Sequence, residues 1–121
     1  MKTNIICRLQ VEGLHWWSEA SKYEPTMVYL ESPHRHMFHI EVKKEVFHDD
    51  RDVEFIMFKR DVQDYLYEKY HNKQDRCHRF GPMSCEMIAS NVLKHLIDKY
   101  GERNWKVSVF EDDIQGGIIE D

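Results

Sequence analysis

Two histidines separated by one residue, His34 and His36, open the alternating stretch HRHMFHIEV. Residues two positions apart on a β-strand project from the same face, so both imidazoles could bind one metal ion. His15, which follows the first expected strand, is the candidate third ligand, and three histidines leave the fourth position of a catalytic zinc ion open to water or substrate. Because the chain has eight histidines, this spacing also arises often by chance, and a sheet merely lined by histidines is the alternative.

Strands must position these histidines, and the alternation of apolar and polar residues predicts where the strands lie. Four strands are expected, over 3–11, 34–43, 105–110 and 114–120. Gly13 is expected to end the first strand. The last two strands are expected to form a hairpin, with Gly116 and Gly117 opening its second strand.

Two helices are expected between the strand pairs. Apolar residues at helical spacing predict the first helix over 55–70. The second follows Ser84, a favourable N-cap residue, and stops at Gly101. Residues 18–26 and 72–82 are polar and are expected to be loops. The order strand, strand, helix, helix, strand, strand predicts one α+β domain over 1–121, with both helices packed on one face of an antiparallel sheet.

Composition narrows the class of protein. The chain has 121 residues, of which 41% are hydrophobic and 32% charged, as is typical of a globular domain. It has no apolar run of about 18 residues, so no transmembrane helix is expected, and its start lacks the pattern of a signal peptide. The net charge of −5 argues against nucleic acid as the main partner. Three irregularly spaced cysteines favour reduced thiols and a cytoplasmic location.

Several phrases, in order along nearly the whole chain, resemble the 6-pyruvoyltetrahydropterin synthase family, which includes the carboxytetrahydropterin synthases. The phrases are VEGLHWW, HRHMFHIEV, IMFKRDV, Tyr70-His71, PMSCEMIA and VFED. The resemblance implies the tunnelling fold, in which two strands, two helices and two strands assemble into barrels of several subunits. It therefore also implies a homo-oligomer of the trimer or hexamer type, with sites near the subunit interfaces.

The resemblance also implies roles for individual residues. The zinc ligands would be His15, His34 and His36. Glu111 would anchor the pterin ring by accepting hydrogen bonds from its guanidine-like edge, a bidentate contact that suits a buried planar pair of donors. Ser84 and Cys85 would contact the ligand at the start of the second helix, and His71 would take the place of the catalytic histidine of the family.

The sequence departs from the family pattern at the catalytic positions. Leu30 stands where a catalytic cysteine precedes the histidines, Tyr70 replaces an aspartate, and Arg35 replaces the glycine between the two histidines. One branch of the family carries E-x-x-H-G-H instead, and Glu31 has this spacing. The alternative for Glu31 is a solvated side chain before a turn, and the alternative for His71 is an ordinary surface loop.

Two functions follow from the resemblance. The E-x-x-H-G-H branch cleaves the side chain of dihydroneopterin triphosphate to leave 6-hydroxymethyl-dihydropterin, which predicts a zinc-dependent lyase in which a carboxylate transfers the proton. The alternative is a non-catalytic relative that binds a pterin, purine or nucleotide. HRHMFHIEV and HDDRDVEFIMFKRD also resemble bacteriophage proteins, and such a relative could sequester a nucleotide signal of the host.

Overall fold

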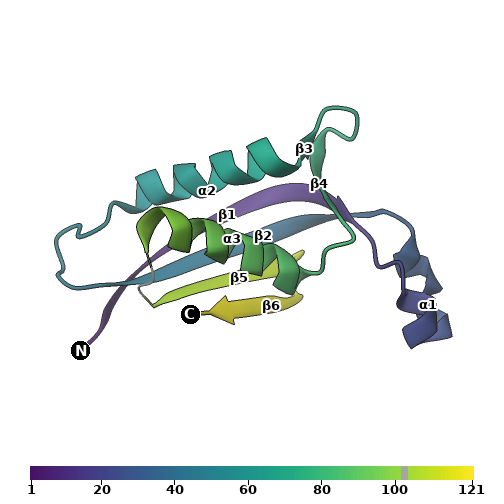
Figure 1. The fold of residues 1–121 in the computed structure, drawn as a ribbon, viewed down its shortest axis with the longest axis horizontal. Coiled ribbons are helices and arrows are strands. Elements are labelled where there is room, and N and C mark those ends of the chain that lie inside the picture. The colour runs from purple at the N-terminus through teal and green to yellow at the C-terminus, as the bar shows by residue number, and fades with distance from the viewer. Residues whose placement is uncertain (102–103) are drawn as a thin grey trace.

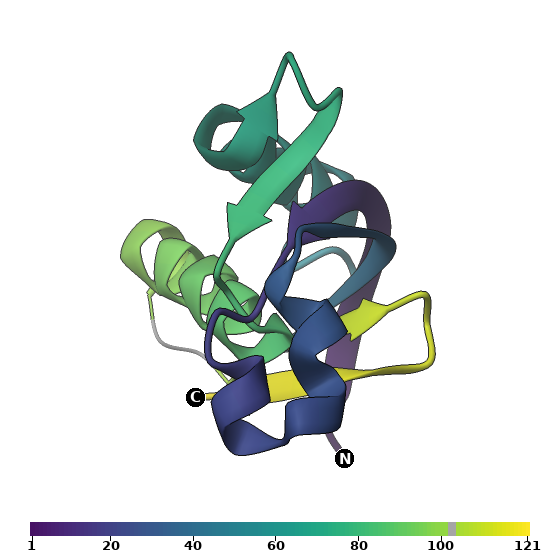
Figure 2. The ribbon, with the colours of Figure 1, turned by 90° about the vertical axis from the view of Figure 1, so that its right-hand side faces the viewer.

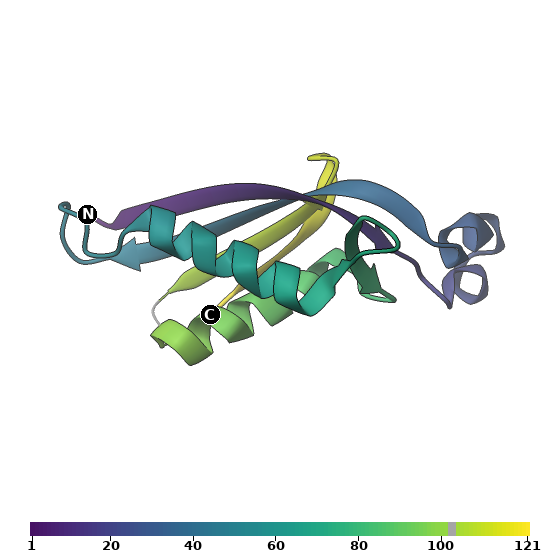
Figure 3. The same ribbon diagram turned by 90° about the horizontal axis from the view of Figure 1, so that it is seen from above.

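The computed structural model describes residues 1–101 and 104–121. Its elements are, in order, β1 (Thr3–His15), α1 (Ala20–Tyr23), the 3₁₀ helix η1 (Pro25–Glu31), β2 (His34–Val46), α2 (Phe55–Tyr70), β3 (His71–Asn72), β4 (Cys77–Gly81), α3 (Cys85–Tyr100), β5 (Trp105–Glu111) and β6 (Gln115–Glu120). The strands form one sheet in the order β3-β4-β1-β2-β5-β6. Helices α2 and α3 both cover one face of this sheet (Figure 1, Figure 3), which confirms the predicted α+β architecture.

The two longest strands, β1 and β2, are antiparallel partners from Thr3↔Val46 to His15↔His34. Alternate side chains of both strands are buried against the helices, because successive residues of a strand face opposite sides of the sheet. The predicted alternation is therefore confirmed for both strands. Both also run further than expected, since β1 continues through Gly13 to His15 and β2 continues to Val46.

Gly13 does not end β1, contrary to the expectation, because its missing side chain serves packing. A Cβ atom placed on Gly13 would lie 2.5 Å from Cε2 of Phe80 and 3.1 Å from Cδ2 of Phe38. The rings of Phe38 and Phe80 contact each other with centroids 4.9 Å apart. A glycine at this position therefore lets two buried aromatic rings meet directly over the strand.

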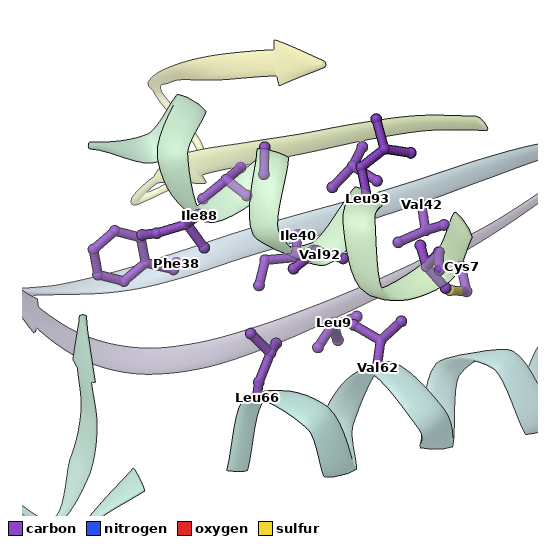
Figure 4. Packing of buried hydrophobic residues seen from close by; sticks show 14 of the residues in the cluster. Cys7, Leu9, Phe38, Ile40, Val42, Val62, Leu66, Ile88, Val92 and Leu93 are labelled. Carbon is purple, nitrogen blue, oxygen red and sulfur yellow. The ribbon is translucent and has the colours of Figure 1, made fainter. Parts of the chain in front are cut away.

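The core lies between the sheet and the two long helices (Figure 4). It combines residues of β1 and β2, such as Leu9 and Ile40, with residues of α2 and α3, such as Leu66 and Val92. The bounds of α2 agree with the predicted helix. The hydroxyl of Ser84 accepts a hydrogen bond from the amide of Met87 (3.2 Å), which confirms the predicted cap of α3. None of the helices that the structure describes is long and apolar enough to span a membrane.

The segment expected to be a loop over 72–82 instead contains β4 and the end of β3. These two strands form a short hairpin through His71↔His78 and Asn72↔Cys77, and β4 also pairs with β1 in the parallel direction. The polar residues that suggested a loop make the turn of the hairpin, whereas Cys77, His78 and Phe80 are buried. One parallel pair thus extends the otherwise antiparallel sheet.

The predicted hairpin of β5 and β6 is present, and it turns at two aspartates in the gap between the two predicted strands. Asp112 and Asp113 have φ values of 51° and 58°, and the amide of Ile114 donates to the carbonyl of Glu111 (3.0 Å). These are the features of a type I′ turn, in which aspartate tolerates the left-handed conformation. Gly116 lies inside β6, where a Cβ atom would overlap the carbonyl oxygen of Val109.

A short helical arm, residues 18–33, connects β1 to β2 at the end of the sheet away from the N-terminus (Figure 1, Figure 2). It contains α1 and η1, which pack chiefly against each other. The expected loop over 18–26 is therefore helical over Ala20–Tyr23. The arm lies at the same end of the molecule as His15 and His34, the residues at which it leaves and enters the sheet.

Candidate metal centre

The three predicted zinc ligands come together where β1 ends and β2 begins. His15 pairs directly with His34, and His36 lies opposite Gly13, so the antiparallel register brings all three rings to one face of the sheet. The ring centroids are 4.5 Å apart for His15 and His34, 5.5 Å for His15 and His36, and 5.2 Å for His34 and His36. One potential ligand atom from each residue lies within 4.8 Å of the other two. This histidine triad could therefore hold a metal ion.

Each ring of the triad is held through its Nδ1 atom. The acceptors are the carbonyl of Met83 for His15 (3.0 Å), the carbonyl of Ser32 for His34 (2.9 Å) and Oδ2 of Asp112 for His36 (2.7 Å). A carbonyl or ionised carboxylate oxygen only accepts, so Nδ1 must be the donor in each ring. In the neutral tautomer, the lone pair of all three rings is then on Nε2. Metal-binding histidines are oriented by such acceptors.

The three acceptors come from segments far apart in the chain. Met83 precedes α3, Ser32 follows η1, and Asp112 is the first central residue of the β5–β6 turn. Asp112 is also tied to β2, because its amide donates to the carbonyl of Met37 (2.7 Å) and its Oδ1 accepts from the amide of Met37 (3.0 Å). The hydrogen bond from His36 lowers the pKa of Asp112, so this carboxylate is ionised at neutral pH.

None of these three supports was predicted. Met83 and Ser32 act through backbone carbonyls, which every residue type carries, so no pattern of side chains could have indicated them. Asp112 offered a signal, since it is a carboxylate beside the singled-out Glu111 at the end of an expected strand. Its contact with His36 nevertheless depends on the type I′ turn, whose geometry the strand pattern alone does not specify.

Glu111 lies on the Nε2 side of the triad. Its Oε1 is 2.9 Å from Nε2 of His15, and its Oε2 is 3.5 Å from Nε2 of His36. The contact with His15 lowers the pKa of Glu111 and outweighs the opposing effect of burial. For His15, burial favours a lower pKa, but Glu111 and the carbonyl of Met83 together raise the pKa above its ordinary value. The residue expected to anchor a pterin therefore faces the atoms that would bind the metal.

The environment of the buried Nε2 atom of His15 indicates that a metal ion would fit this site. Nε2 of His15 is buried and, although Oε1 of Glu111 lies 2.9 Å away, has no hydrogen-bond partner among the described residues. A buried polar atom without a partner costs about 1–3 kcal/mol. A cation beside His15 would satisfy both this nitrogen and the carboxylate of Glu111. Three imidazoles with an adjacent carboxylate are a donor set that suits zinc.

The structure does not bring Glu31 to the triad. Its carboxylate accepts a hydrogen bond from the amide of Ser21 (2.8 Å) within the helical arm, and hydrogen bonding to Ser21 lowers the pKa of Glu31. Among residues 1–101 and 104–121, Glu31 has no hydrogen bond or ion pair with a histidine. Its spacing of three residues before His34 thus places it near the site along the chain, but its side chain is directed into the arm.

His71 also lies apart from the triad. It begins β3, its ring stacks on Tyr67 with centroids 4.3 Å apart, and β4 separates its strand from β1. Two strand spacings amount to about 10 Å. His71 therefore does not contact the triad of the same chain, and its catalytic role stays a prediction.

Ser84 and Cys85 lie close to the triad but differ in what they offer. The hydroxyl of Ser84 is used to cap α3. The thiol of Cys85 lies 3.9 Å from Oε1 of Glu111. Burial, together with the charges of Glu111 and Glu86, raises the pKa of Cys85 to about 12. This thiol is protonated at neutral pH, so it does not replace the catalytic cysteine that the family carries elsewhere.

Arg35, which replaces the glycine between the two histidines, has a structural role on the opposite face of the sheet. Its guanidinium donates to the carboxylate of Glu12 on β1 and to the backbone carbonyl of Asp75 in the β3–β4 turn. Asp75 in turn pairs with Arg79 of β4 (3.0 Å). Arg35 thereby connects β2 across β1 to the hairpin at the edge of the sheet, without obstructing the triad.

Comparison with known proteins supports the fold. No protein-family model matches the sequence, and no curated protein matches it. The structure is similar to that of 6-pyruvoyl tetrahydropterin synthase from Plasmodium falciparum, with a TM-score of 0.68 and 16% sequence identity. The similarity covers 99% of this chain and 98% of the other. At this identity the match shows a common fold, and it confirms the tunnelling-type architecture expected from the sequence.

Proposed function

We propose that this chain is a zinc-dependent enzyme of the lyase type that converts a pterin such as dihydroneopterin triphosphate, by side-chain cleavage or elimination. The observation that carries the proposal is the histidine triad, whose three rings are oriented through Nδ1 and each offer one ligand atom within 4.8 Å of the other two. Zinc bound by His15, His34 and His36 would supply a Lewis acid that polarises the side-chain hydroxyls of the substrate. The shared fold and the resemblance in sequence favour a pterin as the substrate.

Cleavage of the pterin side chain requires a residue of the protein that can take up and return a proton. The second hydroxyl of the pterin side chain loses a proton and becomes an aldehyde as the bond between the two hydroxyl-bearing carbons breaks. The electron pair of that bond passes to the carbon attached to the ring, which then takes up a proton. One residue that accepts a proton and returns it is sufficient, so no oxidant or reductant is needed.

Glu31 and His71 are the residues proposed to move this proton. Glu31 could do so only after its carboxylate leaves the amide of Ser21, because that hydrogen bond now holds it in the arm. His71 is two strands away from the triad of its own chain, and so would have to serve the site of a second copy. Glu111, Ser84 and Cys85 are the residues proposed to contact the heterocycle.

A homo-oligomer of the trimer or hexamer type is part of the proposal. In the described sheet, β6 forms one edge and β3 the other. Unpaired edge strands favour pairing with another chain, and closed symmetric assembly is a common way to cover them. Such assembly would also bring the hairpin that carries His71 close to another subunit.

Zinc analysis followed by a substrate assay tests this function. We expect nearly one zinc per chain in the purified protein, its loss in His34→Ala, and turnover of dihydroneopterin triphosphate by the zinc-loaded protein. Glu31→Gln should abolish turnover while zinc stays bound, and Glu24→Gln in the same arm is the matched control. Protein without zinc after careful preparation would contradict the metal site. Full activity of Glu31→Gln would remove Glu31 from the reaction.

The second candidate is a protein that binds a pterin, purine or nucleotide without converting it. It is favoured by the positions of the two residues proposed to move the proton, since Glu31 is hydrogen-bonded to Ser21 and His71 is two strands away from the triad of its own chain. Saturable binding of dihydroneopterin triphosphate or of a guanine nucleotide, without product over long incubation, would support this candidate over the enzyme.

A further inference from the structure

The carboxylate of Glu111 is largely buried beside the histidine triad, and a buried negative charge is unfavourable without a cation nearby. The Glu111 side chain is 19% exposed, and its two oxygens point to two different histidines of the triad. The ladder pair Phe38↔Glu111 and the turn that follows hold its backbone, so this position is built into the junction of β2 and β5. No basic residue other than a histidine forms an ion pair with Glu111 among the described residues.

The tautomers of the histidines determine whether the contact with Glu111 is attractive or repulsive. The carbonyl of Met83 fixes the proton of the neutral His15 ring on Nδ1, so its Nε2 presents a lone pair to Oε1 of Glu111 at 2.9 Å. The same reasoning applies to Nε2 of His36, because its Nδ1 faces Asp112. Two acceptors at this distance repel each other unless they share a cation, which is either a proton or a metal ion.

The distances agree with one shared coordination shell. Zinc bonds to nitrogen and oxygen are about 2.0–2.1 Å long, so neighbouring ligand atoms of a tetrahedral site are about 3.3 Å apart. The two contacts between Glu111 and the Nε2 atoms, at 2.9 Å and 3.5 Å, lie on either side of this value. The carboxylate therefore occupies the side of the triad at which a fourth ligand would bind.

We propose that Glu111 is the fourth protein ligand of the metal held by the histidine triad when no substrate is bound. This inference rests on the proposed metal site. It gives the resting protein a closed shell of three histidines and one carboxylate, in contrast to the open shell of a catalytic zinc site. A heterocycle that hydrogen-bonds to Glu111 must then compete with the metal for the same carboxylate. Ligand binding would thereby open the coordination position that the chemistry needs.

Cobalt substitution tests the coordination without relying on activity. Co²⁺ in place of zinc reports the number of its ligands in its visible spectrum, and azide reports whether a position is open. In Glu111→Gln, we expect Co²⁺ affinity to fall by about tenfold or more and azide affinity to rise by a similar factor. Glu120→Gln, the same change at the far end of the hairpin, should alter neither, because in the described part of the chain Glu120 pairs only with Lys106, at the surface.

An unchanged Co²⁺ spectrum and azide affinity in Glu111→Gln would overturn the inference while leaving the triad as a metal site. Failure of the wild-type protein to bind Co²⁺ or zinc at all would overturn both the inference and the proposed function. A crystal structure of the zinc-loaded wild-type protein gives an answer that does not depend on a folded variant. A Glu111 oxygen at about 2.0–2.2 Å from zinc supports the inference, and one beyond about 3 Å overturns it.

Discussion

Histidines gather at two places on this sheet, and only one of them has the features of a metal site. The histidine triad lies where β1 and β2 meet the arm, and an edge pair, His71 and His78, lies on β3 and β4. Each group contains one buried ring, since His15 is 7% exposed and His78 is 9% exposed. The two groups therefore differ in what surrounds the rings and not in burial.

The surroundings of the edge pair are aromatic. His71 stacks on Tyr67, and His78 stacks on Phe80 with centroids 5.9 Å apart and an interplanar angle of 23°. In the triad, each Nδ1 instead faces an oxygen acceptor. Over residues 1–101 and 104–121, the triad is also the only group of three or more potential ligands close enough for one ion. His15 and His36 also contact the ring of Phe38, and His78 also has a backbone contact with Glu12, so the triad is distinguished by the convergence of its three rings and by the carboxylate that faces them.

The two buried histidines, His78 and His15, have pKa values shifted in opposite directions. Burial lowers the pKa of His78, with a further decrease from the charge of His71, and the backbone contact with Glu12 does not compensate. Burial acts in the same direction on His15, but the contacts with Glu111 and Met83 outweigh it and raise the pKa. A facing carboxylate thus decides whether a buried imidazole on this sheet favours its charged or its neutral form.

The largest effect expected from this comparison is on zinc binding by two alanine variants. His15→Ala removes one ligand and should weaken zinc affinity on the order of 1,000-fold, since about 10–16 kcal/mol of zinc binding is shared among the ligands of a site. His78→Ala, at a similarly buried position, should leave zinc affinity unchanged and lower the stability of the fold. Competition with a chromophoric chelator measures both. An equal loss of zinc affinity in the two variants would show that the triad is not a more specific metal site than the edge pair.

A smaller effect is expected from the acceptor that orients His36. Asp112→Asn weakens the hold on Nδ1 and should reduce zinc affinity by roughly 10–100-fold. Asp113→Asn is the matched control, because it lies in the same turn with the same left-handed backbone and has no hydrogen bond or ion pair among the described residues. Both variants are compared by zinc competition, with circular dichroism as the check on folding. Similar losses in the two would mean that the turn matters and the carboxylate does not.

Gly13 lies between the two groups, since it pairs with His36 on one side and with His78 on the other. Gly13→Ala would force its Cβ atom against the buried ring of Phe80 and should destabilise the protein by about 1–3 kcal/mol. Gln10→Ala on the exposed face of the same strand should stay within about 0.5 kcal/mol of the wild type. Urea unfolding measures both. Stability of Gly13→Ala close to the wild type would show that the rings can separate at little cost.

The smallest effect concerns the pH dependence of stability in the metal-free protein. Because the pKa of His78 is lower in the folded than in the unfolded chain, its contribution is complete above the unfolded pKa and is lost as pH falls through the folded pKa. His78→Gln should therefore lose less stability than the wild type between pH 7.5 and pH values below about 6.5. Urea unfolding across this window gives the comparison, and parallel curves for the two proteins would contradict it.

Much of the fold was predictable because its signals are local. Helix α2 has its predicted bounds, and α3 has its predicted cap and stop, since periodicity and capping depend on residues within a few positions of each other. The short strands β3 and β4 were missed because their polar turn dominates the composition of the segment. The continuation of β1 was missed because the need for Gly13 comes from Phe80, a distant residue.

The common face of His34 and His36 follows from their spacing in the sequence, because alternation is a property of the extended backbone. The order of elements in the sequence also predicted that β1 would pair with β2 and bring His15 to them. The atoms that orient the rings follow only from the packing of the folded chain, as does the position of Glu111, which faces Nε2 of His15 and His36 while Glu31 turns into the arm. Those contacts join residues far apart in the chain, and they depend on the packing of α3, the arm and one hairpin turn, which no local pattern encodes.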